Sequence, residues 1–123
     1  MIQNSAGLVA TRLETFMAPD DNRMTPDTAA LITALNHPLR RRILRVLATG
    51  ESASATDLSE LLDVRLGNIA YHMKVLTELK VLWLSGTQQV RGAQERFYRS
   101  VLDGKPQWAK TALEETRRGD EAG

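Results

Sequence analysis

The chain has 123 residues, of which 42% are hydrophobic, and its formal net charge is only +1. This length accommodates one compact core with an added helix at either end, and no stretch approaches the ~18 apolar residues of a membrane span. The sequence has no cysteine and two histidines, which excludes disulfides and deprives a structural zinc site of its soft ligands. Because the N-terminus has no basic segment followed by an apolar run, we expect a cytoplasmic protein.

The charged residues are unevenly distributed along the chain. Residues 37–101 hold ten lysines and arginines against six carboxylates, whereas the two flanks together hold six basic and nine acidic residues. A basic middle between acidic ends favours a core that meets a polyanion, with flanks that serve another purpose.

A helical arm is predicted over residues 1–24. Ser5 is a good helix-capping residue type, and apolar residues, including Leu13 and Phe16, recur after it at close to helical spacing until Pro19. We therefore expect an amphipathic helix that precedes the main core.

Two further helices are predicted between this arm and Gly50. The first begins at the Thr-Pro-Asp sequence of residues 25–27, because proline is tolerated at the first helical position. The second runs from about Leu39 to Ala48. Its arginines are expected on the outer face, where a solvated surface is favoured over phosphate contacts: Arg40, Arg41, Arg42 and Arg45.

The segments 54–62 and 67–79 predict two short helices joined by a tight turn. Ser54 followed three residues later by Asp57 is an acidic variant of the capping box, and it marks the start of the first helix. Two short helices with so brief a connection indicate a helix-turn-helix.

Beyond residue 80 the apolar period changes from helical to two. Residues 81–85 and 95–101 are rich in β-branched and aromatic side chains and predict a hairpin with a polar, basic tip. A last helix follows Pro106, and Trp108 and Leu113 lie on its apolar stripe, ahead of a short disordered tail. The predicted fold class is mainly α with a small β-hairpin.

Four stretches in this order form a specific combination: ALNHPLRRRILRVLATG, SATDLSELLDV, GNIAYHMKVLTELKVLWL and VRGAQERFYRSV. Together they resemble the ArsR-type winged helix-turn-helix transcription regulators of bacteria. The resemblance covers residues 35–101, a little over half of the chain. It implies a DNA-binding domain over residues 25–104, with a recognition helix that begins near Leu66 and a wing at Gln88–Gln94.

The sequence departs from the family pattern at several positions. Asp63 stands where glycine is usual in the turn, although aspartate tolerates a left-handed backbone. Arg65 replaces a capping serine before the recognition helix, and Lys80 replaces the glycine after it. The cysteine pairs and the Asp, His and Glu sets through which such regulators sense metals are missing, so we expect a member that binds no metal and needs no cofactor.

The outward face of the recognition helix follows from its period. With Ile69 and Leu76 pointing inward, about 100° per residue places Gly67, Tyr71 and Lys74 nearly opposite, with Asn68 on the flank. Asparagine can pair with adenine, and lysine can contact phosphate. The predicted DNA-contacting residues, with a merely solvated surface as the alternative, are Arg65, Gly67, Asn68, Tyr71, Lys74, Gln89 and Arg91.

The two histidines have simple structural interpretations. His72 falls near the inward side of the recognition helix, where a half-buried, hydrogen-bonded ring is favoured over a ligand role. His37 precedes Pro38 at a helix junction, where a local backbone bond is the simplest role.

The terminal helices predict self-association. Their apolar stripes are difficult to bury within so small a domain, so a two-fold dimer is expected through Leu13, Phe16, Trp108 and Leu113. The leading function is a sequence-specific repressor that binds double-stranded DNA, and a winged-helix module that binds a protein partner is the alternative. No nucleophile, carboxylate pair or phosphate loop indicates an enzyme. The sequence does not define an effector.

Overall fold

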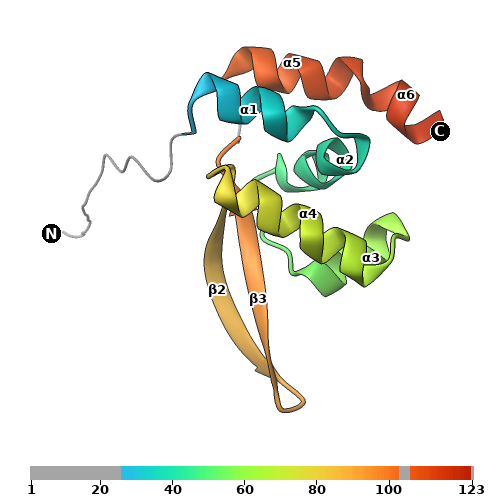
Figure 1. Ribbon diagram of the computed structural model, residues 1–123. Coiled ribbons are helices and arrows are strands. Elements are labelled where there is room, and N and C mark those ends of the chain that lie inside the picture. Colours follow the sequence, from blue (N-terminus) through green and yellow to red (C-terminus); the bar gives the residue numbers. More distant parts are fainter. Residues whose placement is uncertain (1–25, 103–105, 123) are drawn as a thin grey trace, which may run out of the picture.

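The computed structural model describes residues 26–102 and 106–122. Its elements in chain order are α1 (Thr28–Leu35), α2 (Pro38–Leu47), α3 (Ala55–Leu62), α4 (Leu66–Glu78), β2 (Leu82–Val90), β3 (Ala93–Ser100), α5 (Gln107–Glu115) and α6 (Arg117–Ala122). The helices gather at one end of the molecule, and the hairpin extends away from them (Figure 1). The mainly helical fold with one β-hairpin is thereby confirmed. The predicted arm, with Leu13 and Phe16, lies outside the described residues.

The core lies where α2, α3, α4 and the start of the hairpin meet. α4 contributes Ile69, Met73 and Leu76 to it, spaced three or four residues apart, so that one face of the helix is buried. α2 contributes Ile43, Leu44 and Leu47, each with no exposed surface. Fully burying such a side chain stabilises the fold by about 1.5–3 kcal/mol. These contacts fix the direction in which the opposite face of α4 points.

Local capping explains where the first helices begin. Asp27 caps α1, since its Oδ1 accepts from the backbone N–H of Ala30 at 2.8 Å. The predicted start, with Pro26 as the first helical residue, was therefore wrong by two positions. The capping box of α3 is confirmed: Ser54 Oγ accepts from the N–H of Asp57 at 3.0 Å, and Asp57 Oδ2 accepts from the N–H of Ser54 at 3.1 Å.

The turns around α4 use a left-handed backbone without glycine. Asp63 has φ 57° at the end of α3, and Lys80 has φ 67° just after α4. Aspartate tolerates this conformation better than most residues, and the prediction for Asp63 is confirmed. Arg65, which precedes α4, makes no side-chain capping bond, so the cap residue offers the N-terminal amides of this helix only its backbone carbonyl, which accepts from the N–H groups of Asn68 and Ile69.

The hairpin is longer and more regular than the sequence indicated. β2 pairs with β3 in antiparallel register from Leu82↔Ser100 to Val90↔Ala93, with an irregularity between Leu84 and Gly86. Only Arg91 and Gly92 form the turn, with φ 52° and 81°, as in the two-residue turns that match strand twist. The predicted wing loop at Gln88–Gln94 is corrected: most of it is paired β-ribbon.

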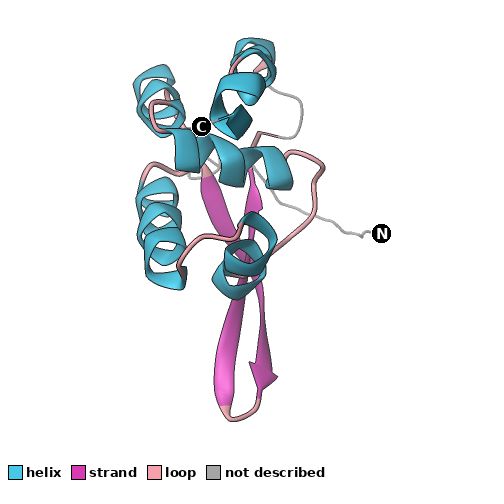
Figure 2. Cartoon of the chain, turned by 90° about the vertical axis from the view of Figure 1, so that its right-hand side faces the viewer, coloured by secondary structure: helices cyan, strands magenta, loops and turns pink. Residues whose placement is uncertain are grey.

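A short bridge joins the base of this hairpin to α3. The N–H of Ala53 donates to the carbonyl of Tyr98 at 3.0 Å, and the N–H of Tyr98 donates back at 2.9 Å. Seen from the side, the two strands pass beside the helical layer and continue beyond it (Figure 2). The bridge therefore ties the root of the β-ribbon to the segment that leads into α3.

The C-terminal segment packs onto its own protomer. Leu113 is only 3% exposed and belongs to the core, so the prediction that it contacts a partner chain is corrected. The predicted disordered tail, residues 119–123, is also wrong over 119–122, which belong to α6 (Arg117–Ala122). Both corrections have one cause: α5 and α6 fold back against α2, which buries Leu113 within the chain.

The arginines of α2 are structural, which corrects the prediction of a solvated face. Arg40 Nη2 donates to the carbonyl of Thr33 at 2.8 Å, and Arg42 Nη2 donates to that of Leu62 at 3.0 Å. Arg41 and Arg45 bind Asp120 of α6 at 2.8 and 2.6 Å. Four cations on one helix thus hold the ends of α1 and α3 and the C-terminal helix.

Candidate nucleic-acid interface

The exposed face of α4 matches the face calculated from its period. Gly67, Asn68, Tyr71 and Lys74 are all exposed, and Tyr71 presents 61% of its surface. A Cβ built on Gly67 meets no atom within 4 Å, so this glycine is not required by contacts inside the protein. It leaves room for another molecule to approach the backbone near the start of the helix.

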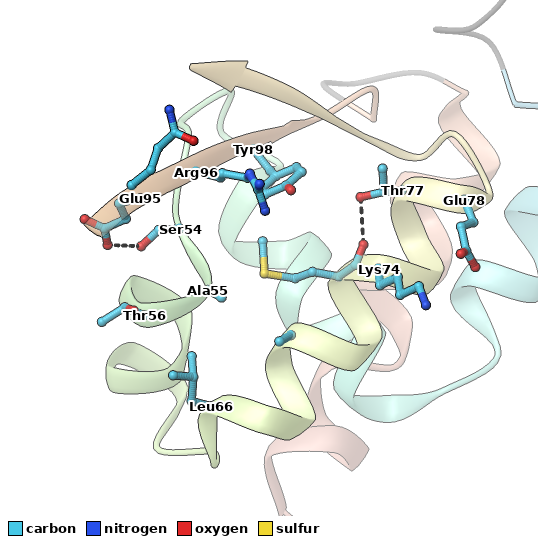
Figure 3. A pocket seen from close by; sticks show the side chains of 13 residues that line it. Ser54, Ala55, Thr56, Leu66, Lys74, Thr77, Glu78, Glu95, Arg96 and Tyr98 are labelled. Atoms are coloured by element: carbon cyan, nitrogen blue, oxygen red, sulfur yellow. Dashed lines mark hydrogen bonds between the residues drawn. The ribbon is translucent and has the colours of Figure 1, made fainter. Parts of the chain in front are cut away.

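A groove of about 570 Å³ lies between α4, the N-terminus of α3 and β3 (Figure 3). Lys74 on α4 and Arg96 on β3 supply its cations, and Thr56 of α3 adds a hydroxyl. Glu78 and Glu95 are the carboxylates of the same lining. The groove therefore presents both charges, with its cations on separate elements.

Glu95 is engaged within the protein. Ser54 Oγ donates to Glu95 Oε2 at 2.7 Å, while the same hydroxyl accepts from the N–H of Asp57. This contact joins β3 to the cap of α3, as the dashed line in Figure 3 shows. The serine is 1% exposed, so the bond forms in a shielded place, where a hydrogen bond to a charged group is worth about 1.5–3 kcal/mol.

Sequence reasoning missed Arg96 and Thr56 as members of this surface. No local pattern relates either residue to Lys74, because the groove is formed by the pairing of β3 beside α3 and α4. An alternation argument along β3 could have identified Arg96, since it is exposed between half-buried Glu95 and Phe97.

The remaining predicted contact residues lie outside the groove. Gln89 and Arg91 are exposed at the far end of the ribbon. The ribbon residues that line the groove are Gln94, Glu95, Arg96 and Tyr98. Arg65 is exposed at the start of α4. The structure thus gives an extended surface, from the N-terminus of α4 through the groove to the ribbon tip.

Behind the exposed face, two histidines and an arginine join α1, α2 and α4. The rings of His37 and His72 lie 4.3 Å apart. Arg40 Nη1 lies 3.4 Å from His72 Nδ1, and its Nε donates to the carbonyl of Ala34 at 3.1 Å. His37 Nδ1 accepts from the N–H of Leu39 at 3.1 Å, which confirms the predicted backbone bond. His72 is buried, more fully than the half-buried ring that the sequence predicted.

The surroundings of both rings lower their pKa and so favour the neutral form. Burial lowers the pKa of His72, and the neighbouring His37 and Arg40 lower it further. Burial also lowers the pKa of His37, followed by the charges of Arg40 and Arg41. Tyr71, whose ring lies 5.0 Å from that of His72, completes the groups around the pair.

This arrangement predicts a pH-dependent stability. A histidine whose pKa is lower in the folded chain than the ordinary 6.5 takes up its proton first in the unfolded chain, so the free energy of unfolding falls as pH drops below about 6.5. Urea unfolding at about pH 7.5 and pH 5.5 measures the loss, which should be smaller in His72→Gln. An equal loss in the variant would show that His72 does not contribute.

The central part of the chain matches a known family. Residues 35–82 match the family model of a helix-turn-helix domain, a stretch that runs from the end of α1 to the first residue of β2. No curated protein matches the chain. Within the matched stretch, α3 and α4 are the two helices that a short turn joins. The match to a helix-turn-helix domain suggests a DNA-binding regulator.

Within residues 26–102 and 106–122, no three His, Asp or Glu side chains gather in a way that could hold a metal ion. No helix in the described part of the chain is long and apolar enough to cross a membrane.

Proposed function

We propose that this protein is a cytoplasmic transcription regulator that binds double-stranded DNA sequence-specifically as a homodimer, most simply as a repressor of the ArsR type. The observation that carries the proposal is the exposed face of α4 within the matched helix-turn-helix domain. It offers an amide at Asn68, a phenol at Tyr71 and an ammonium at Lys74. The proposed activity is binding alone, without a catalytic step, a cofactor or a metal.

The chemistry of this face fits the major groove. An α-helix enters that groove and contacts base edges with the outward residues near its N-terminus. Asn68 is the third residue of α4 and can pair bidentately with adenine, whereas Lys74 lies about two turns along and offers a point charge for phosphate. Arg91 at the ribbon tip can lie along the phosphate backbone of the DNA or enter its minor groove.

Substitutions of Asn68 and Lys74 should affect DNA binding in different ways. Asn68→Ala should cost about 1–3 kcal/mol on a duplex selected from random DNA and little on unselected DNA. Lys74→Ala should weaken binding to both and lower the slope of log affinity against log salt by about one. Fluorescence anisotropy across a salt series measures both effects. If both variants instead weaken binding to the selected and the unselected duplex equally, Asn68 does not contact a base specifically.

Homodimerisation is proposed through the α1–α5 side of the helical layer. α1 packs against α5, yet Ile32 and Trp108 remain 56% and 42% exposed. Two large apolar side chains on adjoining helices favour burial against a second copy. With Leu113 committed to the core, Trp108 is the principal candidate among the described residues that were predicted for the dimer.

Trp108→Ala should raise the dimer dissociation constant about 30-fold or more, since an aromatic at the centre of an interface contributes roughly 2 kcal/mol or more. Sedimentation equilibrium measures the constant. The matched control is Glu115→Ala, an exposed change on the same helix that should leave it unchanged. If the tryptophan variant dimerises as the native chain does, the interface lies elsewhere.

A further inference from the structure

A second charged cluster lies at the helical end of the molecule, where α6 packs on α2 away from the ribbon (Figure 1). Arg41 binds Asp120 through two bonds, from Nε at 2.9 Å and from Nη2 at 2.8 Å. Arg45 Nη2 donates to the same carboxylate at 2.6 Å. Two guanidinium groups thus share one carboxylate, and the triad retains one positive charge.

This charge is poorly accessible to water. The side chains of Arg45 and Asp120 are each 6% exposed, and that of Arg41 is 17% exposed. A buried charge is costly unless a partner of opposite sign compensates it. The cluster is therefore electrostatically suited to one further negative group.

Arg45 has a donor that is not used. Its Nε donates to the carbonyl of Leu113 at 2.8 Å, and its Nη2 donates to Thr116 Oγ1 at 2.7 Å as well as to Asp120. Its Nη1 is buried and has no hydrogen-bond partner among the described residues. Leaving such a donor unpaired costs free energy, so an acceptor at this nitrogen would be stabilising.

Arg45 also lines a hollow of about 470 Å³ between α2 and α5, within the size range of small-ligand sites. Lys110 and Arg117 are the other cations of its lining, and Glu114 is its carboxylate. Glu114 is already paired with Arg117 at 2.9 Å. Lys110 is not paired with this carboxylate, and Arg45 brings the one excess positive charge of its triad with Arg41 and Asp120. Both can therefore attract an anion, while Leu102 and Leu113 provide an apolar wall.

One feature of the hollow opposes an anion. α2 ends at Leu47, and Ala48 and Thr49 line the hollow, so the negative end of the helix dipole faces this side. That end is equivalent to about half an elementary charge. The four ionised groups of the lining, three cations and one carboxylate, have a net charge of +2, which outweighs the partial negative charge of the helix end. A single water could satisfy Arg45 Nη1 but would leave the net charge uncompensated.

We propose that the hollow between α2 and α5 is a binding site for a small anion that carries a carboxylate or phosphate group. Lys110 and Thr49 are exposed and make the first contacts. Arg45 Nη1 is covered in this structure, and it donates to the anion once the ligand seats against it. The site is separate from the α4 face, and the proposal does not depend on DNA binding.

The test is calorimetric titration of the full chain with sodium phosphate and, separately, with sodium citrate, at an ionic strength held constant with chloride. We expect saturable binding of at least one of them with one site per chain. Lys110→Gln should weaken it at least tenfold, while the charge-matched Lys80→Gln, which follows α4, should leave it unchanged. The probe that binds distinguishes phosphate from carboxylate ligands.

The proposal is overturned by the lack of saturable binding of either probe or by unchanged binding in Lys110→Gln. It is also overturned if Lys74→Gln abolishes binding, which would assign the anion to the α4 face. Arg45→Lys provides the second variant, since it keeps the charge and loses the guanidinium fork. Circular dichroism before the titration checks that the Arg45→Lys variant is folded. We expect at least tenfold weaker binding in this variant too, and unchanged binding would also contradict the proposed contact.

Discussion

Asp120→Ala should lower the free energy of unfolding by about 3 kcal/mol or more, because removing one partner of a buried ion pair leaves the other charge uncompensated. Here a single carboxylate serves two arginines, and its side chain is 6% exposed. Urea denaturation followed by circular dichroism measures the loss. The variant should also lose protection of the α6 amides from hydrogen exchange.

The neighbouring residue provides the matched control. Glu121 is also on α6, but its side chain is 61% exposed and its nearest cation, Arg117, is 3.6 Å away. Surface pairs of this kind contribute less than about 1 kcal/mol, so Glu121→Ala should be nearly neutral. Equal losses in the two variants would mean that the contacts with Arg41 and Arg45 do not hold α6 in place.

The same contacts predict how stability depends on acid. The hydrogen bond from Arg41 is the largest cause that lowers the pKa of Asp120 to about 2 from its ordinary 3.8. The unfolded chain therefore binds this proton at higher pH, and the stabilisation is present above about pH 4 and lost as pH falls towards 2. The shift corresponds to roughly 2 kcal/mol. Asp120→Ala should lack this part of the acid response.

The double variant Lys74→Gln/Arg96→Gln should bind DNA about 60-fold more weakly at roughly 0.1 M salt. Each lost phosphate contact removes about 0.9 from the slope of log affinity against log salt, which is nearly tenfold per contact at that concentration. The two cations lie on α4 and β3, on different walls of one groove. The loss should therefore be nearly additive, and the slope should fall by about two.

The two single variants, together with a substitution of an arginine outside the groove, distinguish the loss of groove contacts from a general effect of removing positive charge. Arg118 is exposed on α6, and Arg118→Gln removes one charge without touching the groove. It should change the affinity and the salt slope little. If Arg96→Gln alone is neutral while Lys74→Gln is not, the groove is not occupied by DNA and only the helix face contacts it.

Features decided by neighbours in sequence could be predicted. The capping box at Ser54, the left-handed turn at Asp63 and the buried side of α4 depend on residues at most four positions apart. The exposure of Asn68, Tyr71 and Lys74 follows from the same helical period. The exposed face of α4 could accordingly be located from the sequence alone.

Features decided by packing could not be predicted in this way. Arg41 and Asp120 are 79 positions apart in sequence, and only the return of α5 and α6 onto α2 brings them together. The same return buries Leu113, which a helical period alone cannot distinguish from a residue that contacts a partner. Arg96 enters the groove for a similar reason, since its place depends on how the ribbon is attached at Ala53 and Tyr98.

The most direct test of the proposed function compares the affinity of the full chain for two duplexes of equal length. One is selected from random DNA by repeated binding to this protein, and the other is unselected. The account predicts tighter binding to the selected duplex by about 10³ or more at physiological salt, with protection of two sites about one helical turn apart. Equal affinity for both duplexes would contradict it and would favour a helix-turn-helix that serves as a protein-binding module.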